Sequence, residues 1–163
     1  MKFKIIAVFA IIFATSDTMF AQSADASAEL LPAIYVTKAT DLSFGNIAAG
    51  TSESTVTIAA DVGGNRALAT GDAALVSTDE GGSAKFFLSG LINAEVNLTV
   101  DASIWLSDIS ANSMLVVPAL SATNVTLSSG GAGECYVGGT LTVGANQPSG
   151  YYQSLFTVTA EYQ

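Results

Sequence analysis

Histidine is absent from this 163-residue chain, and cysteine occurs once. Without an imidazole, the chain cannot form a Ser-His-Asp or Cys-His catalytic arrangement, and it lacks the commonest zinc ligand. The single cysteine, Cys135, excludes an internal disulfide. We therefore predict no catalytic residue, no metal site and no cofactor, and we expect that the protein is not an enzyme.

Positive charge is also scarce, because the chain has 5 Lys and Arg residues against 14 Asp and Glu. Two of these cations, Lys2 and Lys4, lie in the first few residues, which leaves Lys38, Arg66 and Lys85 for the rest. Three scattered cations cannot neutralise a phosphate backbone, so we predict that the protein does not bind nucleic acid.

The acidic residues stand mostly alone beside turn-forming residues, as Asp61, Asp72 and Asp108 do. This placement is typical of solvated turn residues that cap their own backbone. Asp79 and Glu80 are the only two acidic residues that are adjacent in the sequence, which makes them the one candidate for cation binding. No calcium-loop motif surrounds them.

Two uncommon side chains have a structural and a functional interpretation. Cys135 lies in an apolar run beside Tyr136, which favours a buried, inert thiol over an exposed reactive one. Trp105 stands between Ile104 and Leu106, and we predict that it belongs to the core. The alternative is an exposed ring that stacks on a sugar.

The first residues resemble a secretory signal. Lys2 and Lys4 precede the apolar run 5–13, and small residues follow around Ala21, Ser23 and Ala26. We predict a signal peptide over 1–23, with cleavage within 21–26. The apolar run is too short for a permanent transmembrane helix, so we expect no integral membrane segment in the mature protein.

Short runs rich in Val, Ile, Thr and aromatic residues alternate with Gly, Asn, Asp and Ser throughout the rest of the chain. Val56 and Ile58 alternate with threonines, as in a half-buried strand. Such spacing predicts an all-β antiparallel sandwich of one domain, 33–163, preceded by a flexible arm, 24–32. The expected strands lie near 33–38, 41–47, 54–60, 65–70, 73–77, 83–89, 94–100, 103–107, 113–119, 123–128, 135–143 and 151–162.

Pairs of glycines interrupt these runs, for example Gly63-Gly64, Gly81-Gly82 and Gly138-Gly139. We expect them to adopt positive φ angles in turns or bulges. None of them is followed by the Lys-Ser/Thr pair of a phosphate-binding loop.

The segment from Gly150 to Gln163 alternates apolar and polar residues, with Leu155 as the exception. It resembles the C-terminal assembly strand of chaperone–usher pilus subunits, which has Gly fourteenth from the end and a penultimate aromatic residue. Gly150 and Tyr162 occupy these two positions. The resemblance implies an immunoglobulin-like sandwich that lacks one strand, and a groove that a chaperone strand and then a neighbouring subunit's arm fill. Its groove residues would be Gly150, Tyr152, Phe156, Val158, Ala160 and Tyr162.

A second resemblance covers most of the chain. Residues 37–47 and 138–143, together with the closing strand, are similar to the bacterial domain-of-unknown-function family 4402. That family comprises exported proteins and itself resembles fimbrial and spore-coat-U-like domains. The resemblance implies the fold and an exported location, and it implies no particular activity.

The resemblances lead to the hypothesis of a structural subunit of a fimbrial or other cell-surface polymer, assembled by donor-strand addition. Its expected partners are a periplasmic chaperone, an outer-membrane usher and other copies of itself or related subunits. It would pass through the periplasm to the cell surface, a fimbrium or the medium. The donor positions of the arm would be Ala24, Ala26, Ala28 and Leu30.

The alternative is a secreted, self-contained β-sandwich that acts as a binding or adhesin module, with carbohydrate as the ligand considered. A polymer subunit needs an incomplete sheet and a free arm. A binding module needs a closed sheet and an exposed aromatic patch. The sequence leaves this choice open.

Overall fold

The computed structural model describes residues 22–76 and 81–163, and all regular structure in these ranges is β-strand. The predicted signal peptide and the Asp79-Glu80 pair lie largely or wholly outside the described residues. The chain divides into two units, Met1–Leu30 and Leu31–Gln163. In the first unit, residues 22–30 are exposed and form no strand.

The second unit holds all the strands of the described residues, and every pairing between them is antiparallel. In chain order they are β1 (Tyr35–Thr40), β2 (Ile47–Ala48), β3 (Ser54–Ile58), β4 (Arg66–Thr70), β5 (Ala74–Leu75), β6 (Ala84–Ser89), β7 (Glu95–Val100), β8 (Ile104–Ser107), β9 (Ser113–Leu120), β10 (Asn124–Thr126), β11 (Ala132–Val143) and β12 (Val158–Tyr162).

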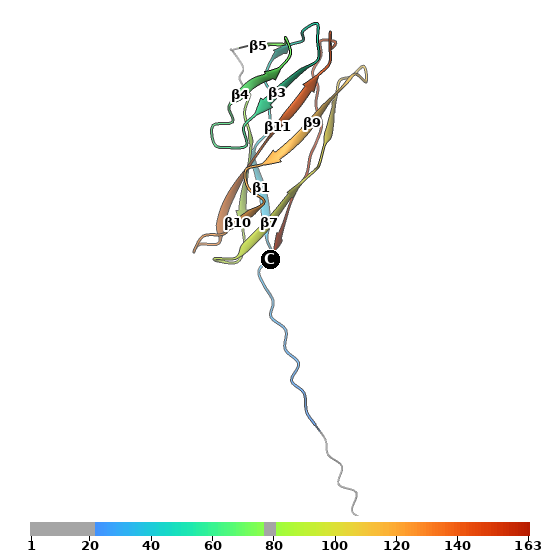
Figure 1. Ribbon diagram of the computed structural model, residues 1–163. Helices are drawn as coiled ribbons and strands as arrows, with labels where there is room; N and C mark the ends of the chain where they lie inside the picture. The colour runs from blue at the N-terminus through green and yellow to red at the C-terminus, as the bar shows by residue number, and fades with distance from the viewer. Residues whose placement is uncertain (1–21, 77–80) are drawn as a thin grey trace, which may run out of the picture. The chain divides into compact units, whose positions relative to one another are not determined.

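The large sheet is built around β11. Its strand order is β1-β6-β11-β3-β4, and the hairpin β8–β9 joins it because β9 also pairs with β11. A smaller sheet has the order β10-β7-β12, and β2 and β5 form a short third pair. Figure 1 shows β3, β4 and β9 around the upper part of β11, with β1, β7 and β10 around its lower part. The predicted all-β antiparallel sandwich is confirmed.

Alternating side chains explain how these strands bury one face. On β3, Val56 and Ile58 are buried while Thr55 and Thr57, which alternate with them, are half-exposed, as predicted. The first core cluster lies between β6, β7 and the first half of β11: Ala84, Phe86, Leu88, Val96, Leu98, Leu127, Cys135 and Val137. The second lies between β3, β9 and the second half of β11: Phe44, Val56, Ile58, Val116, Leu141 and Val143.

Most strands lie near their predicted positions, and two predictions were wrong. Instead of a strand over 41–47, Ser43 forms an isolated bridge to Gly82, and regular pairing begins only at Ile47, the first residue of β2. Gly45, with a φ of 65°, interrupts the extended backbone there. The final strand begins at Val158 rather than near 151, and Gln153 contributes a single bridge to Ser107 before it.

The glycine prediction holds for Gly64 and Gly81, which have positive φ, and fails for Gly138-Gly139. These two lie inside β11, where a side chain on Gly138 would overlap the Ile58 carbonyl. A side chain on Gly139 would come within 2.8 Å of the Val117 carbonyl oxygen. The pair therefore allows β3 and β9 to approach β11 closely from its two sides.

The predicted burial of Trp105 was wrong, because 58% of its surface is exposed. On β8 the neighbouring residues Ile104 and Leu106 pack against the second core cluster. Strand alternation then directs Trp105 away from the core. The predicted burial of Cys135 is confirmed. Leu98 is also buried, whereas Val100, Phe156 and Val158 are only half-buried.

Candidate functional site

The C-terminal strand contributes a row of half-buried apolar side chains. Phe156, Val158, Ala160 and Tyr162 all pack against the first core cluster. The Phe156 ring meets Phe86 edge to face, with ring centroids 6.1 Å apart. The structure thus brings together four of the six predicted groove residues against the first core cluster, three of them on one face of β12 and Phe156 just before it.

One edge of β12 pairs with β7 and the other carries no strand among residues 22–76 and 81–163. Gln163 donates its backbone N–H to the Glu95 carbonyl oxygen at 3.1 Å. The main-chain N–H and C=O groups of the odd-numbered residues of β12 therefore point to β7. The N–H and C=O groups of Val158, Ala160 and Tyr162 therefore point to the unpaired edge. This edge displays main-chain donors and acceptors next to half-buried apolar side chains, which is the arrangement an added strand needs.

The other margin of this region is β1, which pairs only with β6 among the described strands. Ile34 and Val36 direct half-buried side chains to the first core cluster, as the β12 residues do. β1 and β12 lie close together in the fold. We call the two unpaired strand edges, with these six side chains, the β1–β12 seam.

Tyr162 closes one end of the seam. Its hydroxyl donates to the Pro32 carbonyl at 3.1 Å and accepts the Leu91 N–H at 2.7 Å. Gly90 makes the room, because a side chain there would overlap the Tyr162 hydroxyl. The penultimate aromatic residue therefore joins the segment that leads into β1 to the end of β12 within one molecule.

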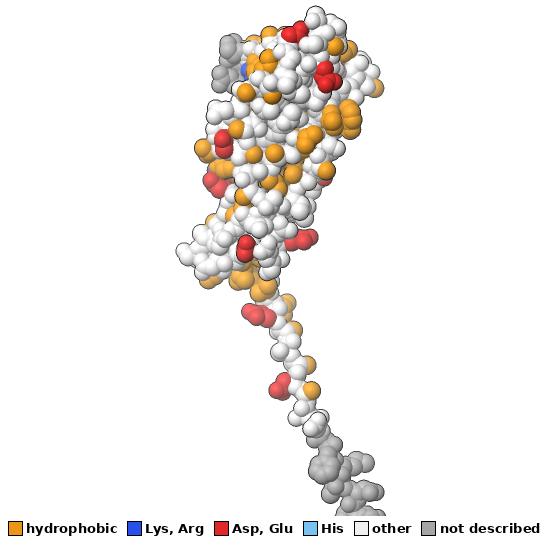
Figure 2. Space-filling view, viewed as in Figure 1, with side chains coloured by type: hydrophobic (Ala, Val, Ile, Leu, Met, Phe, Trp, Pro, Cys, Tyr) orange, Lys and Arg blue, Asp and Glu red, His pale blue; other side chains and the backbone are white. Residues whose placement is uncertain are grey.

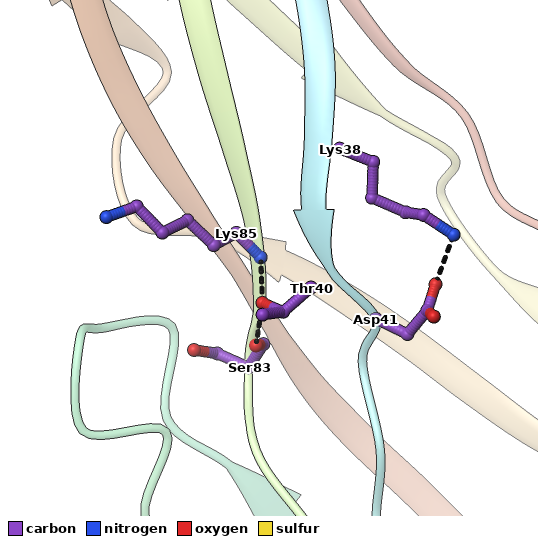
Figure 3. Close-up of polar contacts among 5 residues, drawn as sticks. All are labelled: Lys38, Thr40, Asp41, Ser83 and Lys85. Atoms are coloured by element: carbon purple, nitrogen blue, oxygen red, sulfur yellow. Dashed lines mark hydrogen bonds and ion pairs between the residues drawn. The ribbon is translucent and has the colours of Figure 1, made fainter.

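A bulge at the end of β1 marks the other end of its pairing with β6. Lys38 lies opposite Phe86 and Thr40 lies opposite Lys85, which leaves Ala39 as the extra residue. Figure 3 shows how Thr40 bridges the break: its hydroxyl accepts the Lys85 N–H at 2.9 Å and donates to the Ser83 carbonyl at 3.3 Å. Beyond the bulge, Lys38 forms an exposed ion pair with Asp41.

The remaining predicted site residues lie elsewhere. The hydroxyl of Tyr152 donates to the Pro148 carbonyl at 2.7 Å and accepts Gln147 Nε2 at 3.0 Å, in the loop that precedes β12. Gly150 lies against Asp108, whose Oδ2 would be 3.2 Å from a Cβ at that position. Neither residue belongs to the apolar cluster of the seam. The predicted donor positions Ala24, Ala26, Ala28 and Leu30 are exposed, with Leu30 at 93%.

The outer face of β6 and β11 carries the most concentrated polar contacts near the seam. Lys85 forms an ion pair with Glu134 at 2.7 Å and lies over the rings of Phe87 and Tyr136, at 4.8 and 5.4 Å. The hydrogen bond from Lys85, and then that from Tyr136, lowers the pKa of Glu134, while Glu134 raises the pKa of Lys85. Both shifts favour the charged forms, so the ion pair across β6 and β11 is maintained near neutral pH.

Cys135 and the lone acidic residues are the other chemically reactive groups that the sequence singled out. Cys135 is fully buried, and desolvation raises the pKa of its thiol, so little reactive thiolate forms. Asp61 and Asp108 each accept backbone N–H groups of their own turns, as predicted for the lone acids. In the part of the chain that the structure describes, no three His, Cys, Asp or Glu side chains converge on a metal site. The same part contains no helix that is long and apolar enough to cross a membrane.

Comparison with protein families found a match to the model described as Domain of unknown function (DUF4402), over residues 34–162. The chain belongs to this family. Comparisons with curated proteins and with solved structures found no significant match.

The match begins at Ile34, which packs against the first core cluster just before β1, and ends at Tyr162. The DUF4402 domain thus includes both margins of the seam, and the arm residues 22–33 precede it. Surface charge on the domain is sparse. On the face shown in Figure 2, acidic side chains stand singly among polar and apolar groups.

Sequence reasoning missed two features of this DUF4402 domain. The first is the partnership of Tyr162 with Pro32 and Leu91, because hydrogen bonds over 71 and 130 residues leave no local pattern. The second is the exposure of Trp105. The flanking Ile104 and Leu106 share the opposite parity on the strand, but all three residues are apolar, so local alternation does not indicate which parity is buried.

Proposed function

We propose that this DUF4402 domain is a structural subunit of a fimbrial or other cell-surface polymer, assembled by the addition of a donor strand to the β1–β12 seam. The observation that carries the proposal is the unpaired edge of β12. It combines free main-chain groups at Val158, Ala160 and Tyr162 with apolar side chains that the core covers only in part. A strand added there would gain hydrogen bonds along the edge and would bury these side chains further.

The arm has the length and exposure for this role. Residues 22–31 would span roughly 33 Å as an extended strand, against about 17 Å for the five residues of β12. Alternate positions Ala24, Ala26, Ala28 and Leu30 would face the seam. Since three of the four are alanines, the affinity would rest on main-chain hydrogen bonds and on Leu30, and the register would be weakly specified.

In this proposal the subunit is exported, is held in the periplasm by a chaperone strand, and is passed by an outer-membrane usher to a neighbouring subunit at the cell surface. The chaperone strand and the arm compete for the same edge. No step requires catalysis, a metal or a cofactor.

Amide hydrogen exchange of the mature chain, 24–163, tests the proposal. A synthetic peptide of residues 22–34 is added in excess, and exchange is measured by mass spectrometry in the C-terminal segment. We expect the peptide to slow exchange at Val158, Ala160 and Tyr162, because pairing satisfies these outward N–H groups. A matched peptide with Ala26→Pro and Leu30→Pro should have no effect, since proline has no N–H to donate and fits poorly within a paired strand.

Two results would contradict strand addition. One is equal protection by the wild-type and proline peptides. The other is a mature chain that, without any chaperone, is a stable monomer with reversible unfolding and slow exchange at the β12 edge, which would mean that the sheet is already complete.

The self-contained binding module is the second candidate, and the exposed Trp105 favours it. A stable monomer in the experiment above would support this candidate. The site that such a module would use lies beside the β8–β9 hairpin, and it does not depend on the seam.

A further inference from the structure

The exposed face of the β8–β9 hairpin is unusually apolar. Trp105 lies opposite Leu115 in the register, so both side chains are on the face turned away from the second core cluster. Val117, two residues along β9, lies on the same face and is exposed. Indole rings are mostly buried in folded proteins. An exposed indole within an apolar strip therefore marks a candidate ligand-binding surface.

A hollow of about 360 Å³ lies beside this strip. It exists because Ser107 and Gln153 exchange two backbone hydrogen bonds, both at 3.1 Å, which hold the segment before β12 against the end of β8. Ser107 follows Trp105 on the same face of the strand, roughly 7 Å along. The hollow is lined by Ser107, Asp108, Ile109, Ser110, Ser149, Gly150, Tyr151 and Gln153.

The lining combines an aromatic ring with neutral polar groups. The Tyr151 side chain is 80% exposed, and serine hydroxyls and the Gln153 amide lie near it. Asp108 accepts the N–H groups of Ser110 at 2.9 Å and Asn112 at 2.8 Å, and the Asn112 side-chain amide at 2.8 Å. These bonds, that of the Asn112 side chain first, lower the pKa of Asp108 and keep its carboxylate charged.

The charge pattern selects among ligands. The residues that line the hollow include a carboxylate and no Lys or Arg, so an anionic ligand would be repelled. A neutral ligand with one apolar face and several hydroxyls matches both halves of the surface. Its C–H groups would stack on the negative face of an aromatic ring, and its hydroxyls would bond to the serines and the amide.

We propose that Trp105, Tyr151 and the adjoining hollow form a binding site for neutral carbohydrate. The hollow lies at the small end of the range for small-molecule sites, roughly 300–1,000 Å³, and would take one sugar ring of a longer chain. Trp105 would stack on the next ring. In a surface protein such a site would attach the molecule to glycan, whether or not its strands polymerise.

Tryptophan fluorescence tests this directly, because Trp105 is the only tryptophan in the chain. The mature protein is titrated with cellopentaose, maltopentaose, mannopentaose and chitopentaose. We expect at least one of these neutral oligosaccharides to shift the emission saturably, since stacking removes water from the indole. Tyr151→Ala should weaken that affinity about tenfold, the effect of one lost ring contact.

The matched control is Tyr35→Ala, which removes an exposed tyrosine from β1 and should leave the affinity unchanged. Calorimetric titration of Trp105→Ala should show loss of binding, with its circular dichroism and melting temperature confirming a folded protein. The proposal is overturned if none of the four oligosaccharides binds, or if Tyr151→Ala and Tyr35→Ala behave alike. It is also overturned if the emission shifts with protein concentration alone, which would identify the strip as a contact between copies.

Discussion

Replacing Gly90 with alanine should open the clamp that holds the two ends of the DUF4402 domain together. The new methyl group would overlap the Tyr162 hydroxyl and lie 3.2 Å from its Cζ atom. The ring can swing away only by giving up the hydrogen bonds to Leu91 and Pro32. Losing both bonds and part of the ring packing should cost about 2–3 kcal/mol of unfolding free energy.

A double-mutant cycle isolates this mechanism. Tyr162→Phe removes the hydroxyl alone and should cost about 1 kcal/mol, because the half-buried Leu91 N–H loses its partner. In that background Gly90→Ala meets no hydroxyl, so its cost should fall by about 1 kcal/mol or more. The assay is urea unfolding of the four mature proteins at equilibrium. Costs that add to within about 0.5 kcal/mol would refute the clamp.

Three further predictions concern other parts of the chain. Leu141→Ala should cost about 2–5 kcal/mol in the same assay, whereas Trp105→Ala should cost less than about 1 kcal/mol, since only the first side chain is buried. The hydroxyls and N–H groups of Ser52 and Thr51 lower the pKa of Asp72. The charged Asp72 carboxylate therefore stabilises the folded protein fully above its unfolded-state pKa, and this stabilisation is lost as the pH falls below it. Asp72→Ala should therefore lose less stability than the wild type between neutral pH and about pH 3, measured by urea midpoints. Mass spectrometry of exported protein should find a mature N-terminus between residues 22 and 27, and an intact Met1 would contradict the signal peptide.

Local alternation carried most of the fold prediction, and it failed where the pattern was ambiguous. On β3, Thr55 and Thr57 alternate with Val56 and Ile58, so the apolar pattern allows only one parity to be buried. On β8, Trp105 and its two neighbours are all apolar, and the alternation cannot tell which face is inside. The buried parity is set by β9, which places Met114 and Val116 on the core side.

The candidate site was predicted in part for a similar reason. The alternation of Phe156, Val158, Ala160 and Tyr162 is local, and it predicted one shared face. Gly150 and Tyr152 continue the pattern in the sequence, but the chain between Gln153 and Val158 leaves the strand. The exception at Leu155 was the visible sign of that break.

The position of β11 has a consequence for the order of folding. Its residues pair with β6 and β3, which lie far back in the sequence, and with β9, which is nearer. The hairpins β3–β4 and β8–β9 are local, but within the large sheet they are joined to β6 only through β11. During synthesis or export from the N-terminus, β3 and β6 must wait with unpaired edges until residues 132–143 arrive. Such distant pairing is slow, because each contact closes a long loop before it gains any stability. The last fifth of the chain therefore decides when the rest can fold, and a protein that holds the early strands apart would act in that interval.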